Sequence, residues 1–256
     1  MDTARIALLH LATVPGAIRQ NRYVIEEGVK HAASVGARWI VSPELAVCGL
    51  QFVPFVGTDW IEPQPDGWMQ RFCRLVRNVG RTVFISCPER DGKQLYNSVF
   101  VINSRGEVAG KHRKINVASD SRSWSSPGDV VAPITCDGVK VGLPICSDMY
   151  TRNITDALKA KGAQMFVSPA SWGPGIHGPN GEWEQRTRET ELPLIVCNRT
   201  GAEKTLDFWK APSLVVRNGE WLLSHTSDRS AVLIFDWNFR SMTPVSSVYQ
   251  TDYFRG

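Results

Sequence analysis

The sequence predicts an α/β protein in which mixed β-sheets are covered by helices. Short runs rich in β-branched residues alternate with amphipathic stretches from the N-terminus onward, which is typical of strands joined by crossover helices. Two further segments indicate tight hairpins, and a hairpin joins antiparallel strands. A chain that combines crossovers with hairpins is expected to build mixed sheets. No linker-like stretch divides the 256 residues, so we expect one domain over residues 1–256.

The first third of the chain predicts strands that alternate with helices. The strands are expected at residues 6–9, 39–41 and 82–85, and the helices at residues 18–35 and 66–79. Gly80 is a typical stop signal at the end of the second helix, because glycine adopts the left-handed conformation at low cost. This order corresponds to a parallel β-α-β-α-β arrangement.

The rest of the chain mixes hairpins with crossovers. One hairpin is predicted around the turn at residues 103–106 and another around the turn at residues 217–220, because both turns consist of turn-forming residues. Between them we expect a strand that runs up to Cys146 and, after it, helices and strands in alternation: a helix at residues 154–161, a strand at 165–167, a helix at 182–191 and a strand at 194–197.

Composition argues against several classes of protein. The net charge of +4 is spread along the chain, and only residues 111–114 form a tight basic cluster, so a nucleic-acid surface is not expected. No run approaches the roughly 20 apolar residues that span a bilayer, and residues 1–10 lack the features of a signal peptide. We therefore expect a cytoplasmic protein. The six cysteines show no metal-finger spacing, so no metal site is expected.

Three reactive side chains follow three different predicted strands. Glu44 follows the strand at residues 39–41, Lys114 closes the basic cluster after the first hairpin, and Cys146 ends an apolar run. Taken singly, each has an ordinary explanation: a solvated carboxylate, a solvated basic turn and a buried thiol. Together they form a complete chemical set, because a thiol needs a base to become a nucleophile and an ammonium stabilises an oxyanion.

The segments around these residues resemble the nitrilase superfamily of carbon-nitrogen hydrolases. SPELAVCGL, GKHRKINV and VGLPICSDMY match, in order, the segments that supply the family's glutamate base, lysine and cysteine nucleophile. The similarity continues through DALKAKGA, VSPASW and ETELPLIVCNRTG, so it covers nearly the whole chain. The resemblance implies a four-layer αββα sandwich that assembles as a homodimer or a larger homo-oligomer.

The resemblance also implies a mechanism. Glu44 would act as the base and Cys146 as the nucleophile, while Lys114 and the backbone N–H of Ser147 would hold the oxyanion. Hydrolysis would pass through a thioester and release an acid with ammonia or an amine, and it would need no metal or organic cofactor. The expected partner is a small-molecule amide or nitrile, and Trp172 would border its pocket.

Two departures from the family pattern bear on the substrate. Most members carry a second glutamate before a Pro-Gly turn, whereas Asp120 is the only acid in the corresponding window of this chain. Amino-acid carbamoylases of the family place an arginine four residues after the nucleophile, where this chain has Tyr150. A phenol cannot make the bidentate clamp of a guanidinium, although Arg152 lies nearby. We therefore expect a small neutral or aromatic amide rather than an N-carbamoyl amino acid.

Three alternatives remain open at the level of the sequence. The same chemistry would serve a nitrilase, or an acyltransferase that passes the thioester to another amine. The absent second glutamate also allows a non-catalytic family member that acts as a binding or scaffold protein, although the retention of Glu44, Lys114 and Cys146 argues against it.

Overall fold

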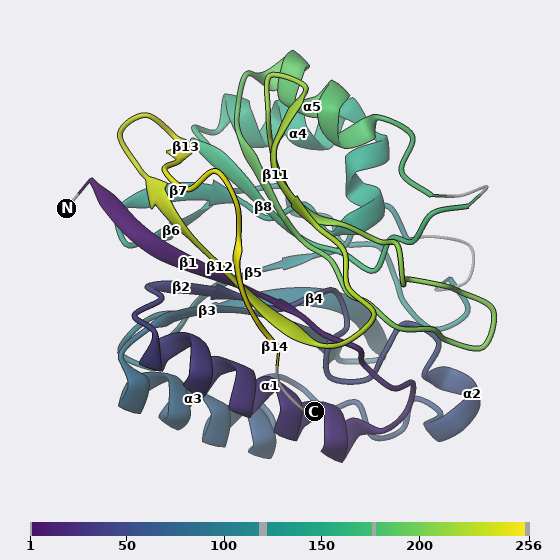
Figure 1. The fold of residues 1–256 in the computed structure, drawn as a ribbon. Helices are drawn as coiled ribbons and strands as arrows, with labels where there is room; N and C mark the ends of the chain where they lie inside the picture. Colours follow the sequence, from purple (N-terminus) through teal and green to yellow (C-terminus); the bar gives the residue numbers. More distant parts are fainter. Residues whose placement is uncertain (1, 118–121, 176–177, 254–256) are drawn as a thin grey trace.

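The structure, a computed structural model, describes residues 2–117, 122–175 and 178–253. Its strands form two sheets that pack face to face, with helices on both outer sides (Figure 1). This arrangement is a four-layer αββα sandwich. The predicted α/β class with mixed sheets is confirmed.

The first sheet is built from both ends of the described chain. Its path is β13-β12-β1-β2-β3-β4-β5, and β14 pairs with β12. The neighbours β1, β2 and β3 are parallel, and the other pairs are antiparallel. Its strands are β1 (Thr3–His10), β2 (Trp39–Val41), β3 (Thr82–Asp91), β4 (Gln94–Ile102), β5 (Val108–Arg113), β12 (Ala231–Asn238), β13 (Thr243–Pro244) and β14 (Gln250–Tyr253).

The second sheet comes from the middle of the chain, in the order β11-β10-β9-β8-β7-β6. Parallel pairing joins β7, β8 and β9, and antiparallel pairs extend the sheet at both edges. Its strands are β6 (Ile134–Cys136), β7 (Val139–Gly142), β8 (Met165–Pro169), β9 (Leu194–Cys197), β10 (Ser213–Arg217) and β11 (Glu220–His225).

The helices cover the two outer faces. The first sheet is covered by α1 (Ile18–Ser34) and α3 (Gly67–Val79), and the second by α4 (Arg152–Ala160) and α5 (Glu182–Thr190), as Figure 1 shows. A short helix, α2 (Val53–Val56), and a 3-10 turn, η2 (Cys146–Tyr150), complete the set within the described ranges. The boundaries of α3 agree with the sequence signals, because the Asp66 side chain accepts a hydrogen bond from Met69 N–H (2.7 Å) and Gly80 has φ 66°.

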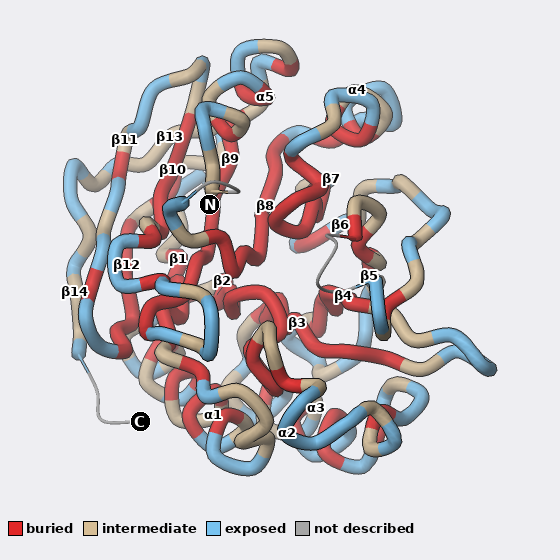
Figure 2. Tube along the Cα trace, turned by 90° about the vertical axis from the view of Figure 1, so that its right-hand side faces the viewer, coloured by how far each residue is buried: buried red, intermediate tan, exposed pale blue. Residues whose placement is uncertain are grey.

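Strand alternation divides the core into two parts. In β1, Ile6 and Leu8 pack toward the second sheet, whereas Ala7 and Leu9 pack toward α1 and α3. Successive side chains of a strand point to opposite faces, so one continuous apolar run supplies both cores. Figure 2 shows the result as buried strands in the middle and exposure on the outer sides of the helices.

The strand predicted to run up to Cys146 is shorter than expected. β7 ends at Gly142, and its pairing with β8 also ends there. Leu143 and Ile145 are buried but lie outside the sheet. The alternation of apolar residues in this segment therefore reflects packing in the core rather than strand pairing. Cys146 therefore begins the turn η2 instead of ending a strand.

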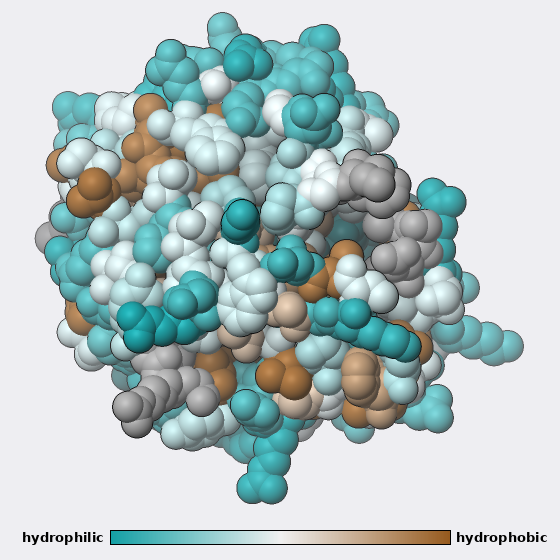
Figure 3. All heavy atoms as spheres, turned by 45° about the vertical axis from the view of Figure 1, so that its right-hand side comes forward, coloured by the Kyte–Doolittle hydropathy of each residue, from teal (hydrophilic) through white to brown (hydrophobic). Residues whose placement is uncertain are grey.

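The surface is mainly hydrophilic on the face drawn in Figure 3, where apolar side chains form separate patches. Across residues 2–117, 122–175 and 178–253, no helix has both the length and the apolar character needed to cross a membrane.

A buried histidine at the end of β1 predicts acid sensitivity. His10 is fully buried, and its Nδ1 lies 2.9 Å from Ser213 Oγ and 3.1 Å from the Asn198 carbonyl oxygen. Burial, helped by the neighbouring His225, lowers the pKa of His10 to about 3. The unfolded chain takes up this proton below about pH 6.5, whereas the folded chain does not until about pH 3. The free energy of unfolding should therefore fall by about 1.4 kcal/mol per pH unit between these values.

Urea unfolding at several pH values between 7 and 4 tests this prediction. His10→Asn keeps a side-chain amide near Ser213 and Asn198 but removes the titrating ring, so its stability should depend less steeply on pH. Parallel curves for the wild type and the variant would contradict the assignment to His10.

Candidate active site

Glu44 is fixed by both sheets. It lies in the turn after β2, and its side chain is fully buried. Its N–H donates to the Ala170 carbonyl (3.3 Å), and its own carbonyl accepts from Ser171 Oγ (3.0 Å), which ties this turn to the segment after β8. The position of the carboxylate therefore depends on the packing of the two sheets.

Lys114 follows β5 directly and forms a buried ion pair with Glu44. Its Nζ donates to Glu44 Oε1 at 2.5 Å, and the two side chains are 3% and 0% exposed. Burial alone would lower the pKa of the Lys114 ammonium, but the nearby Glu44 and Cys146 groups outweigh burial and raise it. The lysine is therefore a protonated hydrogen-bond donor in this site.

Cys146 is the first residue of η2 and is only 6% exposed. Burial raises the pKa of its thiol and the Glu44 carboxylate raises it further, whereas Lys114 and the Ser171 N–H act in the opposite direction. The net effect raises the pKa, so the resting thiol keeps its proton. Attack by this sulfur therefore requires a base, and Glu44 is the adjacent one.

The carboxylate of Glu44 has partners on both oxygens. Oε1 accepts from Lys114 Nζ and also from Asn97 Nδ2 (2.8 Å), while Oε2 accepts from the Ser171 N–H (3.0 Å). The structure thus brings Glu44, Lys114 and Cys146 together as the sequence predicted, and it adds Asn97 and Ser171 to the same site.

Asp148 organises the turn that carries the cysteine. Its carboxylate is fully buried and accepts four hydrogen bonds: from the N–H groups of Ile115, Asn116 and Ile145 (2.9, 2.7 and 2.9 Å) and from His112 Nε2 (2.9 Å). Burial would raise the pKa of Asp148, but His112 and the backbone donors together lower it. This ionised carboxylate ties η2 to the segment that carries the lysine.

Ser147 strengthens the same connection through its side chain. Its Oγ donates to the Asn116 carbonyl (2.6 Å), and Asn116 Nδ2 donates to the Ser147 carbonyl (3.1 Å) and to Thr151 Oγ1 (2.7 Å). These bonds fix the backbone directly after Cys146. The use of the Ser147 N–H as an oxyanion donor remains a prediction.

Aromatic side chains extend from the interior toward the surface near η2. The Trp172 ring lies 4.9 Å from the Tyr150 ring and 5.2 Å from the Trp183 ring, both edge to face. Trp172 is 5% exposed and Tyr150 is 45% exposed. Asn198 fixes the Trp172 backbone by bonding both its N–H and its carbonyl. Tyr150, Trp172 and Trp183, called the aromatic wall below, thus lead from a fixed interior position to an exposed one.

Two further residues were considered from the sequence, Arg152 and Asp120. Arg152, considered as a substitute for the carboxylate clamp, instead donates to Asp156 (2.8 Å) on the exposed side of α4. Its side chain is 62% exposed, and the use of its guanidinium as a substitute clamp stays a prediction. Asp120, one of several candidates to take the place of the second glutamate, lies outside the described residues.

A family model described as carbon-nitrogen hydrolase matches residues 5–244. This chain belongs to the carbon-nitrogen hydrolase family. The resemblance to the nitrilase superfamily is thereby confirmed, and the hydrolase class follows from the family.

Relatives and solved structures agree with this assignment. Over 186 residues, this carbon-nitrogen hydrolase is 30% identical to a nitrilase of Pyrococcus abyssi, covering 72% of this chain and 70% of the relative. Its fold is similar to that of Saccharomyces cerevisiae Nit3, a nitrilase-superfamily member, with a TM-score of 0.80, 19% identity and 96% of each chain covered. An amidase from Nesterenkonia sp. has a TM-score of 0.78 with 23% identity, covering 92% of this chain and 90% of the amidase.

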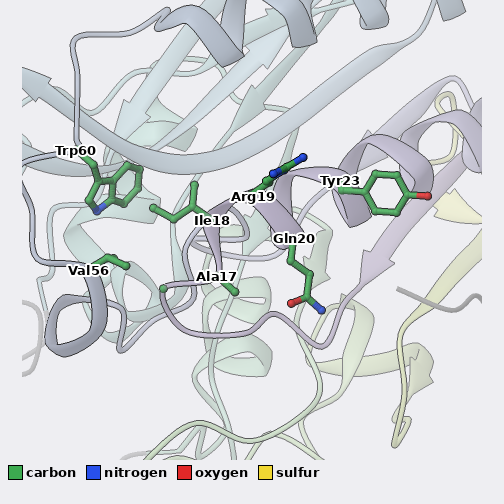
Figure 4. A pocket seen from close by; sticks show the side chains of 8 residues that line it. Ala17, Ile18, Arg19, Gln20, Tyr23, Val56 and Trp60 are labelled. Carbon is green, nitrogen blue, oxygen red and sulfur yellow. The ribbon is translucent and has the colours of Figure 1, made fainter.

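A separate hollow of about 810 Å³ lies at the start of α1. Figure 4 shows Ile18, Val56 and Trp60 near one another at one end, with Gln20 and Tyr23 further along α1. None of the residues that line it belongs to the site around Cys146. Within residues 2–117, 122–175 and 178–253, no group of at least three His, Cys, Asp or Glu side chains is arranged to hold a metal ion.

Asn97, Asp148 and Ser171 are the site residues that the sequence analysis missed. Asp148 stood in the Cys-x-Asp segment, but its role depends on backbone donors that only the fold brings near. Asn97 carried a weaker signal, because it is a polar residue next to the apolar run of residues 99–102. The pairing of β4 with β5 brings Asn97 next to Lys114, which in turn binds Glu44.

Proposed function

We propose that this protein is an amidase that hydrolyses a small linear amide through a thioester on Cys146. The observation that carries the proposal is the buried Lys114–Glu44 pair beside a thiol that keeps its proton. A base, a cationic donor and a nucleophile are thereby available together as three buried side chains. We also propose that residues 1–256 act as one catalytic domain, because Glu44 and Lys114 follow strands of the first sheet and Cys146 follows a strand of the second.

Acylation is the first half of the proposed reaction. Glu44 takes the proton of the Cys146 thiol as the sulfur attacks the amide carbon, which forms a C–S bond and an oxyanion. Lys114 Nζ and the Ser147 N–H donate to this oxygen. Glu44 then gives the proton to the amide nitrogen, the C–N bond breaks, and ammonia or an amine leaves a thioester on Cys146.

Deacylation reverses these roles with water as the nucleophile. Glu44 takes a proton from the water as its oxygen attacks the thioester carbon, and the same donors hold the second oxyanion. The C–S bond breaks, the sulfur regains the proton, and the acid leaves. Glu44 thus transfers a proton in both halves, while Lys114 keeps its positive charge throughout.

The surroundings support a small neutral amide as substrate. Tyr150 occupies the position of the carboxylate-binding arginine, and Arg152 is engaged by Asp156, so neither supplies a free guanidinium to an acidic substrate. Trp172 and Trp183 of the aromatic wall belong to the same buried apolar cluster as Cys146. Structures of the Nesterenkonia amidase include complexes with butyramide and acrylamide, and an acetamide adduct of its active-site cysteine. Small primary amides are therefore the first substrates to test.

The test measures ammonia release from a panel of aliphatic and aromatic amides, nitriles and N-carbamoyl amino acids. Reactions are quenched during turnover, the intact mass is recorded, and the acylated peptide is identified. We expect ammonia and acid from small neutral amides, with the acyl group on Cys146. Cys146→Ala should release no ammonia and carry no adduct.

Other results would replace this proposal. Turnover of nitriles alone indicates a nitrilase, and a new amide formed when a second amine is added indicates an acyltransferase. A wild-type protein that gives neither product nor adduct across the panel contradicts the amidase and favours a binding or scaffold role.

A further inference from the structure

A buried asparagine contacts the proposed base directly. Asn97, in β4, is 1% exposed, and its Nδ2 donates to Glu44 Oε1 at 2.8 Å. Its backbone carbonyl accepts the Lys114 N–H at 2.8 Å. The same residue therefore holds the side chain of the base and the backbone of the lysine.

We propose that Asn97 is a positioning residue for the reaction: together with Lys114 it holds Oε1 of Glu44, so that Oε2 exchanges the proton with Cys146. This inference rests on the proposed function, because it assigns the two oxygens of the proposed base to different tasks.

The hydrogen bonds around the carboxylate separate its two oxygens. Oε1 accepts two side-chain donors, Lys114 Nζ and Asn97 Nδ2, which occupy its lone pairs. Oε2 accepts a backbone donor, the Ser171 N–H, at 3.0 Å. That same Ser171 N–H also hydrogen-bonds the Cys146 sulfur, so Oε2 and the sulfur share one backbone donor. The shared donor is the observation that assigns the proton transfer to Oε2 in this proposal.

The chemistry of an amide suits this task. The Asn97 N–H can hold Oε1 in both states of the cycle, because an amide donor binds an ionised carboxylate and also the carbonyl oxygen of a protonated one. A second cation here would bind the ionised form so strongly that the carboxylate would accept a proton less readily. Asn97 is uncharged, so it fixes the orientation of Glu44 with a smaller effect on its proton affinity.

The other atom of the amide argues against a mainly structural role. Asn97 Oδ1 is buried and has no hydrogen-bond partner among the described residues. A structural asparagine normally uses both ends of its amide, as Asn21 does with Val14 and Val47. Removing the Asn97 amide should therefore change stability little, because the unpaired oxygen disappears together with the bond to Glu44.

Two substitutions at Asn97 test the proposal on the full-length enzyme. Asn97→Leu keeps the approximate volume without a donor, and Asn97→Asp replaces the donor by a carboxylate. We expect Asn97→Leu to lower kcat by about 10- to 100-fold, the usual effect of losing a hydrogen bond to a charged group. KM should stay within about twofold, because Asn97 acts through Glu44 rather than on the substrate.

The pH profile gives a readout that a structural role would not produce. A carboxylate that loses a hydrogen-bond donor holds its proton more tightly. The acid limb, which is the fall of kcat at low pH, should therefore move to higher pH in Asn97→Leu. It should move further in Asn97→Asp, because two adjacent carboxylates share one proton more firmly. Asn21→Ala, which removes a buried asparagine outside the site, should lose stability without moving the limb.

An unchanged acid limb and wild-type kcat in Asn97→Leu would overturn the proposal, as would an equal shift in Asn21→Ala. If the wild type turns over no substrate, the proposed function fails, but the inference is still tested by the rate at which iodoacetamide alkylates Cys146 at each pH. That rate should decrease in both Asn97 variants. The acid limb of its pH profile should again lie at higher pH in Asn97→Leu than in the wild type, and at higher pH still in Asn97→Asp. Identical alkylation profiles would then overturn it.

Discussion

Glu44→Gln is expected to lower amide turnover on the order of 10⁴-fold and to destabilise the fold as well. Loss of activity follows because the amide of glutamine cannot accept a proton from Cys146 or from water, and a positioned base typically supplies about 10²- to 10⁴-fold in rate. Loss of stability follows because Lys114, 3% exposed at its side chain, keeps its charge through Glu44. Removing one partner of a buried pair typically costs about 3–5 kcal/mol.

Cys146→Ala separates the two effects of this substitution. It should abolish turnover while leaving the Lys114–Glu44 pair intact, so its free energy of unfolding should stay closer to that of the wild type. Steady-state ammonia release and urea unfolding at pH 7 measure both quantities. A Glu44→Gln protein that keeps wild-type stability would contradict the view that this pair is a buried charge pair, and turnover within tenfold of wild type would remove Glu44 from the proposed mechanism.

Asp148→Asn is expected to destabilise the protein by about 3–5 kcal/mol and to remove most activity. Its carboxylate accepts four donors in a fully buried position, whereas an asparagine would turn an N–H group toward at least one of them. Activity should fall because η2, which begins with Cys146, would lose its attachment to the segment after Lys114. This would be an effect on geometry, since Asp148 is not assigned a step in the chemistry.

The matched control for this variant is Asp137→Asn. Asp137 also accepts several hydrogen bonds, from Arg38, Trp39 and Thr82, but its side chain is 22% exposed and lies outside the site. Asp137→Asn should lower the free energy of unfolding by less than Asp148→Asn does, and it should leave turnover unchanged. Equal losses in the two variants would contradict a special role for the Asp148 network.

The low pKa of Asp148 also sets the pH range of its contribution. The stabilisation is present above the unfolded value of about 3.9 and is lost as the pH falls through the lower folded value. The loss is therefore confined to pH values below about 4, whereas the effect of His10 begins near pH 6.5. Urea unfolding below pH 4 should show a smaller further loss in Asp148→Asn than in the wild type.

Local sequence signals predicted much of the fold. The second long helix was predicted over residues 66–79 and is α3 (Gly67–Val79), because Asp66 and Gly80 are capping residues that act within a few positions. The hairpin turns were also visible, since turn residues act locally. The strand pairings that could not be predicted join segments far apart in the sequence. An example is the pairing of β1 with β12, where Thr3 lies opposite Asn238.

The apolar run before Cys146 shows why local patterns can mislead. Its alternation continued through Leu143 and Ile145, but β7 ends at Gly142. A pattern of burial cannot distinguish a paired strand from an extended segment inside the core, because both hide alternate side chains. Cys146 was predicted to end a strand, but in the structure it begins a 3-10 turn.

The proximity of Glu44, Lys114 and Cys146 was predictable for a different reason. These residues stand in segments that resemble those of a known family, whereas Asn97 contacts Glu44 through one hydrogen bond across the fold. No spacing in the sequence indicates that bond, because 53 positions separate Asn97 from Glu44. Residues that support a site are harder to predict than those that perform its chemistry, since their role exists only in three dimensions.

The division of the site between two sheets has a consequence for synthesis and unfolding. Glu44 and Lys114 follow β2 and β5 in the first sheet, whereas Cys146 follows β7 in the second. A nascent or partly unfolded chain in which the sheets have not yet docked holds Cys146 apart from Glu44 and Lys114. The three side chains therefore come together only when both sheets have formed and packed against each other.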